Sequence, residues 1–128
     1  MALQFLAIGL AGFFGAITRY AVGGYIKNMM GAAAFPWGTL IVNVTGSFLI
    51  GFLVAMAGGR LPVDPGIRTA VIIGFIGSYT TFSTFSFETL DLMANGSWPA
   101  AALNVVAAVV VGLLAVYLGM NAARFGVT

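Results

Sequence analysis

Cysteine and histidine are both absent from this 128-residue chain, and charged residues make up only 6% of it. The missing cysteine excludes disulfides and thiolate metal sites, and the missing histidine excludes imidazole ligands and nucleophile–histidine pairs. A soluble domain usually carries about 25% charged residues, so this chain has too few polar side chains to cover a soluble surface. The net charge of +2 is too small to indicate nucleic-acid binding. We expect no enzyme, because no nucleophile, base and oxyanion donors occur together.

Apolar residues, by contrast, make up 61% of the chain. At about 20 apolar residues per membrane span, the length allows four spans with short loops. The stretches KNMMGAAAFP, GGRLPVDPG and NGSWP carry the turn residues that separate the spans. The sequence therefore predicts an all-α integral membrane protein, with residues 1–128 forming a single four-span domain. The spans are expected at about residues 3–26, 37–57, 69–94 and 99–124.

Basic residues are divided almost evenly between the two sides of the predicted bundle. If the first residues lie on one side of the membrane, Arg60, Arg68 and Arg124 fall on or near that side. Arg19 and Lys27 fall towards the other side. The positive-inside rule needs a clear excess of Lys and Arg on one side to fix an orientation. The sequence therefore predicts insertion in both orientations and an antiparallel, dual-topology homodimer.

The third predicted span changes character near its middle. Its first half, TAVIIGFIGSY, is apolar, whereas its second half, TTFSTFSFETLDLMA, is polar, and neither half reaches the spanning length. Gly74, Gly77 and Ser78 lie at the junction. Half-helices that meet near the midplane can build an ion site from backbone carbonyls. We predict a break near residues 77–80, and the alternative is an unbroken helix whose hydroxyls bond back to its own carbonyls.

The repeat TTFSTFSFE, residues 80–88, places five hydroxyls beside three phenylalanines. Because positions three apart lie close together on a helix, the repeat predicts three strips of like residues. The strips are Thr81 with Thr84, Phe82 with Phe85, and Ser83 with Ser86. A phenyl ring has a positive edge, so ring edges and hydroxyl donors can receive an anion without a cationic side chain. The alternative is that the phenylalanine pair faces lipid or packs in the core.

Other polar residues within the predicted spans are candidates for the same pathway. Asn43 lies in the middle of the second span and offers two amide donors, although an ordinary hydrogen bond between helices also explains it. Asn104 in the fourth span is comparable but lies nearer an end. Arg19 can extend towards the membrane surface. Glu88 is expected to face an aqueous vestibule or a partner rather than lipid.

With these residues in view, the chain resembles the CrcB/Fluc family of fluoride channels. The strongest stretch is GFIGSYTTFSTFSFE, residues 74–88, which follows the family signature G-[FL]-x-G-x-x-T-T-F-S-T-F-S-x-E. GAITRY at residues 15–20 and WGTLIVNVTGSFLIG at residues 37–51 match two further family stretches. The resemblance covers all four spans. It implies a passive channel that exports cytoplasmic fluoride and thereby relieves its toxicity.

The resemblance also implies two separate fluoride pores in an antiparallel homodimer in the cell inner membrane. By position in the motif, Phe82 and Phe85 are the pore phenylalanines whose ring edges face fluoride. Asn43 is implied as the pore asparagine that donates its amide N–H. Ser83 and Thr84 belong to the hydroxyl-bearing part of the same repeat.

Two further expectations come from the resemblance alone. Arg19 is implied as the first-span arginine near the vestibule, and Glu88 as the carboxylate that closes the motif. A structural sodium ion is implied at the dimer centre, held by main-chain carbonyls of Gly77 and Thr80 from each subunit.

The chain departs from the family pattern in two places. Some members carry a hydroxyl track along the fourth span, but here Asn104 is followed by Ala108 and Gly112, which offer no side-chain donor. The sequence GSY at residues 77–79 replaces the more usual Gly-Gly-Leu and adds a hydroxyl beside the implied sodium site.

Two other functions fit a small four-span protein. A dual-topology, proton-coupled exporter would need a carboxylate in its first span; this span has none, so such a function would have to use Glu88. A structural or assembly subunit would pass no ions at all.

Overall fold

The computed structural model describes residues 1–58 and 63–125, and every regular element in these ranges is helical. Arg60, one of the basic residues used in the topology argument, lies outside the described residues. The elements in chain order are α1 (Ala2–Met30), α2 (Trp37–Ala57), α3 (Pro65–Thr69), the π-helix η1 (Ala70–Ile76), α4 (Gly77–Tyr79), α5 (Phe82–Ala94) and α6 (Trp98–Phe125).

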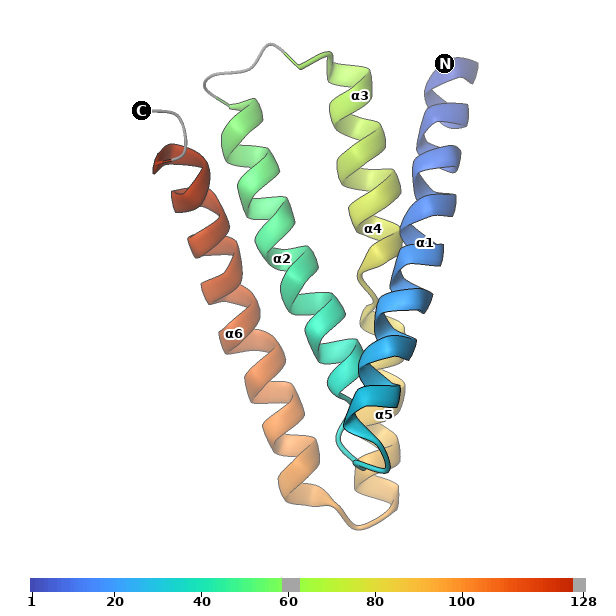
Figure 1. Cartoon of the computed structure of the whole chain (residues 1–128), viewed down its shortest axis with the longest axis vertical. Coiled ribbons are helices and arrows are strands. Elements are labelled where there is room, and N and C mark those ends of the chain that lie inside the picture. Colours follow the sequence, from blue (N-terminus) through green and yellow to red (C-terminus); the bar gives the residue numbers. More distant parts are fainter. Residues whose placement is uncertain (59–62, 126–128) are drawn as a thin grey trace.

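Four helical stretches are long and apolar enough to cross a membrane. They are Ala2–Met30, Trp37–Ala57, the consecutive elements over Pro65–Ala94, and Trp98–Phe125. Consecutive stretches run in opposite directions, so the beginning of α1 and the end of α6 lie at the same end of the molecule (Figure 1). This confirms the prediction of an all-α chain with four potential spans.

The turns between the long helices use the expected residues. Gly31 ends α1 with a positive φ of 63°, and Gly96 has a φ of 77° between α5 and α6. Asp64 caps α3, because its carboxylate accepts hydrogen bonds from the N–H groups of Gly66 and Ile67. Glycine permits the positive φ at residues 31 and 96. The Asp64 side chain satisfies N–H groups at the start of α3 that have no helical acceptor.

Helix α2 lies at the centre of the molecule, between α6 and the elements of the third stretch (Figure 1). It packs most extensively against α6. A Cβ atom on Gly51 would collide with the backbone of Val116, and one on Gly119 would collide with the backbone of Phe48. Small residues therefore bring the two helix backbones into direct contact, as is typical of membrane helices.

Helix α1 packs against η1 in the same way. A Cβ atom on Gly15 would meet the backbone of Phe75, and one on Gly74 would lie 2.6 Å from the carbonyl oxygen of Ile8. The glycines that the sequence places in the spans thus mark real helix contacts, although a Cβ atom on Gly9 would meet nothing within 4 Å.

Two residues with extended backbone separate α4 from α5. Thr80 has φ −83° and ψ 156°, and Thr81 has φ −148° and ψ 116°. Gly77 itself has helical angles, with φ −62° and ψ −33°. The Thr80 N–H still donates to the carbonyl of Ile76 at 3.0 Å, so the helical hydrogen bonding stops between residues 80 and 81.

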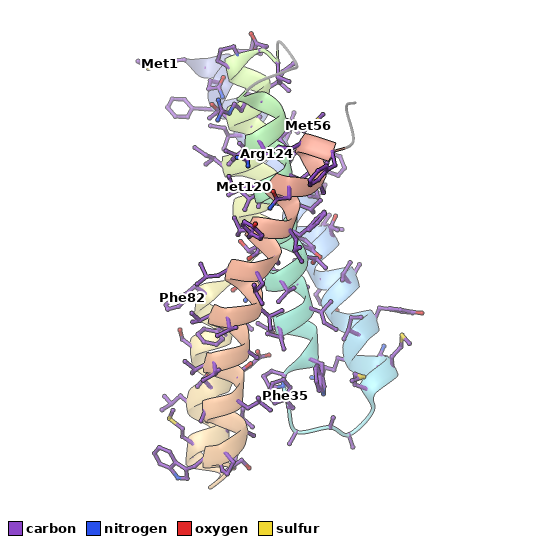
Figure 2. All side chains as sticks on the ribbon, turned by 90° about the vertical axis from the view of Figure 1, so that its left-hand side faces the viewer. Met1, Phe35, Met56, Phe82, Met120 and Arg124 are labelled. Carbon is purple, nitrogen blue, oxygen red and sulfur yellow. The ribbon has the colours of Figure 1, made fainter. Side chains whose placement is uncertain are left out.

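Large apolar side chains cover the outside of the molecule. Phe82 projects from α5 away from the other helices (Figure 2), and 79% of its surface is exposed. Leu3, Phe5 and Leu113 are also largely exposed on the terminal helices. An apolar exterior over apolar helices fits a chain whose surroundings are lipid or a further protein surface.

Candidate functional site

The extended segment between α4 and α5 is held to α2 by Asn43. The Asn43 amide nitrogen donates to the carbonyl oxygen of Thr81 at 3.0 Å, and its amide oxygen accepts from the Thr81 N–H at 2.8 Å. One side chain thereby satisfies both backbone groups of a residue that lies outside any helix. Extended backbone at this depth needs such partners, because lipid offers none.

Thr81 is also the N-cap of α5. Its hydroxyl oxygen accepts from the N–H of Thr84 at 3.2 Å, and its hydroxyl donates to Thr84 Oγ1 at 3.0 Å. The Ser83 hydroxyl lies 3.3 Å from the same Thr81 oxygen. A threonine at this position favours a helix start because its side chain replaces a missing helical acceptor. Helix α5 therefore begins within the repeat, at Phe82, directly after this cap.

The extended backbone at Thr80 and Thr81 separates the carbonyl oxygens of Gly77 and Thr80 from their usual helical donors. In a continuous helix, the carbonyl of residue i accepts from the N–H of residue i+4. For Gly77 that donor is Thr81, whose N–H donates instead to Asn43. For Thr80 it is Thr84, whose N–H donates instead to Thr81. Both carbonyl oxygens are therefore able to accept from another group or to bind a cation.

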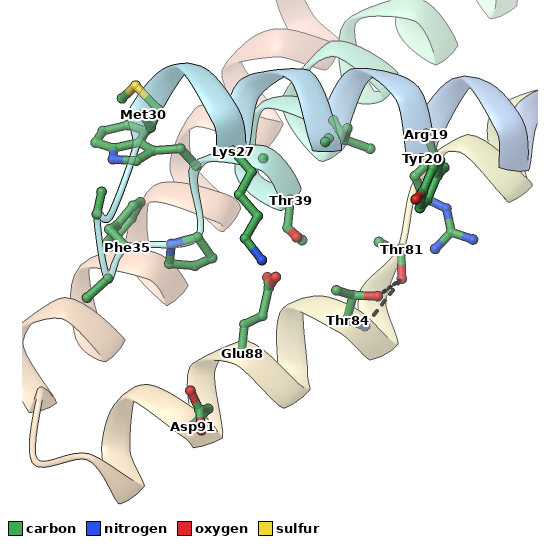
Figure 3. A pocket seen from close by; sticks show the side chains of 18 of the residues that line it. Arg19, Tyr20, Lys27, Met30, Phe35, Thr39, Thr81, Thr84, Glu88 and Asp91 are labelled. Carbon is green, nitrogen blue, oxygen red and sulfur yellow. Dashed lines mark hydrogen bonds between the residues drawn. The ribbon is translucent and has the colours of Figure 1, made fainter.

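A cavity of about 580 Å³ lies between α1, the beginning of α2 and α5. Arg19 and Lys27 reach it from α1, and Glu88 and Asp91 reach it from α5 (Figure 3). Gly23, Gly24 and Gly38 also line this space, and Gly38 lets the beginning of α2 lie against the backbone of Gly23. This cavity therefore carries charges of both signs.

Glu88 faces this cavity from α5. Its side chain points towards the Lys27 ammonium, with the Thr39 hydroxyl nearby (Figure 3). Its Oε2 atom is buried and has no hydrogen-bond partner within residues 1–58 and 63–125. A buried carboxylate oxygen without a donor is unusual, so this atom is free to accept from water or another donor that enters the cavity.

A second cavity of about 310 Å³ lies on the other side of the extended segment. Polar lining comes from Asn43, Ser47, Thr80 and Thr81, and Phe82 borders the same space. Thr81 lines both cavities. The Asn43–Thr81 pair therefore stands where the two hollows approach each other.

The two repeat phenylalanines lie together on α5. Their ring centroids are 5.7 Å apart with an angle of 42° between the ring planes. Phe82 is exposed, whereas Phe85 is half-buried. The hydroxyl groups of the exposed strip, Ser83 and Ser86, lie on the outer surface, and Ser86 donates to the carbonyl of Phe82 at 2.9 Å.

A model of the family described as CrcB-like protein, Camphor Resistance (CrcB), matches residues 6–120. The chain belongs to the CrcB-like family. It is 43% identical over 122 residues to a protein of Magnetococcus marinus named Fluoride-specific ion channel FluC, and the alignment covers 95% of this chain and 98% of that relative. A protein with the same name from Geobacter sulfurreducens is 44% identical over 119 residues, which are 93% of this chain and 95% of the relative.

A longer relative with this name, from Methylococcus capsulatus, is 48% identical over 124 residues. The alignment covers 97% of this chain but only 54% of that protein. All three relatives are named as ion channels, which agrees with the expectation that this CrcB-like chain is not an enzyme.

The structure places the site residues expected from the sequence in three groups within the CrcB-like chain. Arg19, Thr84 and Glu88 line the larger cavity. Asn43 and Phe82 line the smaller one, with Phe85 beside Phe82, and Ser83 lies near the Thr81 hydroxyl between them. Gly77 and Thr80 present carbonyls without their helical donors at the extended segment. The roles implied for these residues stay predictions.

One polar pair in the CrcB-like chain was not foreseen. Asn104 is 1% exposed and donates to Thr89 Oγ1 at 2.9 Å, and Thr89 in turn donates to the carbonyl of Phe85 at 2.7 Å. The asparagine drew notice as a polar residue in an apolar span. Its partner did not, because Thr89 follows the repeat and its inward direction depends on where α5 begins.

Proposed function

We propose that this chain is a fluoride-selective passive ion channel that lets cytoplasmic fluoride leave the cell. The observation that carries the proposal is the relationship described above: relatives aligned over almost the whole chain at 43–48% identity are named as fluoride-specific ion channels. The geometry of the third stretch supports the same function, because donors suited to a small anion lie beside both cavities.

An ion path can run from the larger cavity past the extended segment into the smaller one. Arg19 and Lys27 would attract an anion into the larger cavity. The first N–H groups of α5 have no acceptor within their own helix, and the Thr81 cap serves only that of Thr84. The positive end of the α5 dipole therefore lies beside Thr81, which lines both cavities.

The phenylalanines supply the next part of the path. A ring edge is weakly positive and apolar, so Phe82 and Phe85 can replace water around fluoride without holding it tightly. Conduction needs such a balance, because an ion that binds too strongly does not leave. The Ser83 and Thr84 hydroxyls and the Asn43 amide would add hydrogen-bond donors along this path.

The working unit in this proposal is an antiparallel, dual-topology homodimer in the cell inner membrane, with two pores. The near balance of basic residues supports insertion in both orientations. Phe82, Ser83 and Ser86 form an exposed face of α5 that combines aromatic and hydroxyl groups. Hydroxyls and a pore phenylalanine that faced lipid could not contact an ion. We therefore propose that this face of α5 packs against the second subunit.

The third span is proposed to be a broken helix with a structural sodium ion at its break, at the dimer centre. The freed carbonyls of Gly77 and Thr80 fit this ion, because sodium prefers neutral or anionic oxygen ligands and Gly77 is exposed at the surface of the subunit. Residues 1–58 and 63–125 contain no cluster of three or more acidic side chains that could hold a metal instead. The sodium would hold the two broken helices of the dimer together.

Removal of sodium from purified protein should therefore reduce the dimer fraction on size-exclusion chromatography. An unchanged dimer fraction would contradict this role.

The function is tested by efflux from liposomes. Purified protein is reconstituted with potassium fluoride inside, an ionophore makes the membrane permeable to potassium, and a fluoride electrode follows release. A matched preparation contains potassium chloride and is read with a chloride electrode. Fast fluoride release with little chloride release is expected. Absence of fluoride release from well-folded protein would refute the proposal and favour an assembly role; release that requires a proton gradient and is lost in Glu88→Gln would favour an exporter.

A further inference from the structure

A second contact joins the third span to α2 just before the extended segment. The hydroxyl of Tyr79, the last residue of α4, lies 2.8 Å from the hydroxyl of Thr45. Tyr79 is 5% exposed, and its ring lies parallel to that of Phe75 with centroids 6.1 Å apart. A buried phenol hydroxyl needs a partner, and Thr45 is the partner it has.

The direction of this hydrogen bond follows from the other contacts of Thr45. The Thr45 hydroxyl donates its one proton to carbonyls of its own helix, with Ile41 at 2.8 Å and Val42 at 3.1 Å. A threonine hydroxyl has a single proton but two acceptor lone pairs. Tyr79 must therefore donate, and the Thr45 oxygen accepts. This asymmetry matters, because only Tyr79 would be left without a partner if the contact were lost.

With this contact, each of residues 79–81 packs against or bonds to α2. Tyr79 is bonded to Thr45, and Thr81 is bonded on both its backbone groups to Asn43. Between them, a Cβ atom on Gly46 would collide with the methyl group of Thr80. Residues 79–81 thus rest on residues 43–46, fixed at both ends and close-packed in the middle.

We infer that Tyr79 is a positioning residue which, through Thr45, fixes the end of α4 and so the direction of the freed Gly77 and Thr80 carbonyls. Ser78, the other hydroxyl in this stretch, does not serve this purpose, since it faces α1, where a Cβ on Gly12 would lie 3.1 Å from its Oγ. The link to sodium rests on the proposed function; the mechanical role does not.

The test compares Tyr79→Phe, Thr45→Val and the double variant in the purified full-length protein. Tyr79→Phe removes one oxygen and leaves no buried group unpaired, so amide exchange at residues 80–82 should become about two- to tenfold faster, as for loss of one ordinary hydrogen bond. Thr45→Val strands the buried Tyr79 hydroxyl and should have a larger effect, about five- to a hundredfold. Adding Tyr79→Phe to Thr45→Val should therefore slow exchange again.

This rescue separates a hydrogen bond from general damage to packing, which would make the double variant the worst of the three. Tyr117→Phe and Thr18→Val are matched controls, because Tyr117 is largely exposed and the Thr18 hydroxyl donates to the carbonyl of Phe14 in its own helix. Both should exchange at residues 80–82 like the wild type. Additive effects, or wild-type exchange in Tyr79→Phe, would overturn the inference. If Thr45→Val does not fold, Tyr79→Phe is compared with Tyr117→Phe, and wild-type exchange at residues 80–82 in Tyr79→Phe would overturn the inference.

A sodium titration of thermal stability gives a second readout. In Tyr79→Phe the sodium concentration at half-maximal stabilisation should rise by about two- to tenfold, because the carbonyls are less well directed. A midpoint equal to that of the wild type would overturn the link between Tyr79 and the cation site. If the wild type itself shows no response to sodium, the sodium proposal fails, whereas the exchange experiment still decides the role of Tyr79.

Discussion

Replacement of Asn43 by alanine should release the extended segment from α2. The amide makes two hydrogen bonds to the backbone of Thr81, at 2.8 Å and 3.0 Å. Each contributes about 0.5–1.5 kcal/mol net. The pair therefore stabilises the conformation in which the extended segment lies against α2 (the seated conformation), relative to one in which it is detached (the open conformation), by roughly 1–3 kcal/mol. Since about 1.4 kcal/mol corresponds to a factor of ten, the seated population should fall by about five- to 150-fold relative to the open one.

Two measurements report this change. The initial rate of fluoride efflux from liposomes should fall, by at most the same factor of about five to 150, because the donors at the start of α5 no longer hold one position. Amide exchange at Thr81 should accelerate by a similar factor, because its N–H has lost its acceptor. Asn121→Ala is the matched control, since that amide donates to the carbonyl of Tyr117 within its own helix α6.

The two readouts test different parts of the reasoning. Wild-type exchange at Thr81 in Asn43→Ala would refute the proposed hold on the backbone, whatever happened to the flux. Faster exchange with undiminished flux would show that the seated conformation is not needed for conduction. Lower flux with unchanged exchange would assign Asn43 a direct contact with the ion and no part in holding the break.

Three further substitutions probe neighbouring parts of the site. Phe82→Ile keeps an apolar side chain but removes the ring edge, so fluoride efflux should drop sharply while size-exclusion chromatography still shows the dimer; undiminished efflux would contradict the ring-edge role. Gly46→Ala should displace the extended segment and reduce efflux, whereas Gly9→Ala, which has nothing within 4 Å of its Cβ, should leave efflux unchanged. Thr89→Val strands the buried amide of Asn104 and should cost about 1–3 kcal/mol, seen as a lower melting temperature; an unchanged melting temperature would argue against that hydrogen bond.

Hydropathy and composition were sufficient to predict the four long helices, because a membrane span has a length that the bilayer sets. The turn residues predicted where the helices are separated, and Gly31 and Gly96 indeed have positive φ between helices. The repeat indicated which residues share a side of α5, since positions three apart must lie close together on any helix. These inferences need only local geometry.

Contacts between helices could not be predicted in the same way. The sequence singled out Asn43 but left open whether its amide meets an ion or another helix, and nothing in the spacing indicates that both of its polar atoms meet Thr81. Tyr79 and Thr45 lie 34 residues apart. Their pairing depends on the rotation of two helices about their axes, which close contacts at glycine determine and hydropathy does not.

The hydrogen bonds show which hydroxyls of the repeat already donate their proton to a carbonyl and which do not. A hydroxyl that donates its proton to a carbonyl cannot donate it to an anion at the same time. Thr80 and Ser86 donate to the carbonyls of Ile76 and Phe82. Thr84 instead accepts from Thr81, and within the described ranges none of the hydrogen bonds has Thr84 Oγ1 as the donor.

Thr84 also lines the larger cavity, on the side where Arg19 and Lys27 would gather anions. Its proton is therefore available at the place where an anion would leave the charged cavity for the ring edges. The hydroxyls of the repeat thus serve two purposes: they bond to backbone groups, and they provide a donor for an anion. The Thr81 hydroxyl caps the first turn of α5, and the Thr80 and Ser86 hydroxyls donate to carbonyls four residues earlier, whereas the Thr84 hydroxyl keeps its proton on the side of the proposed ion path.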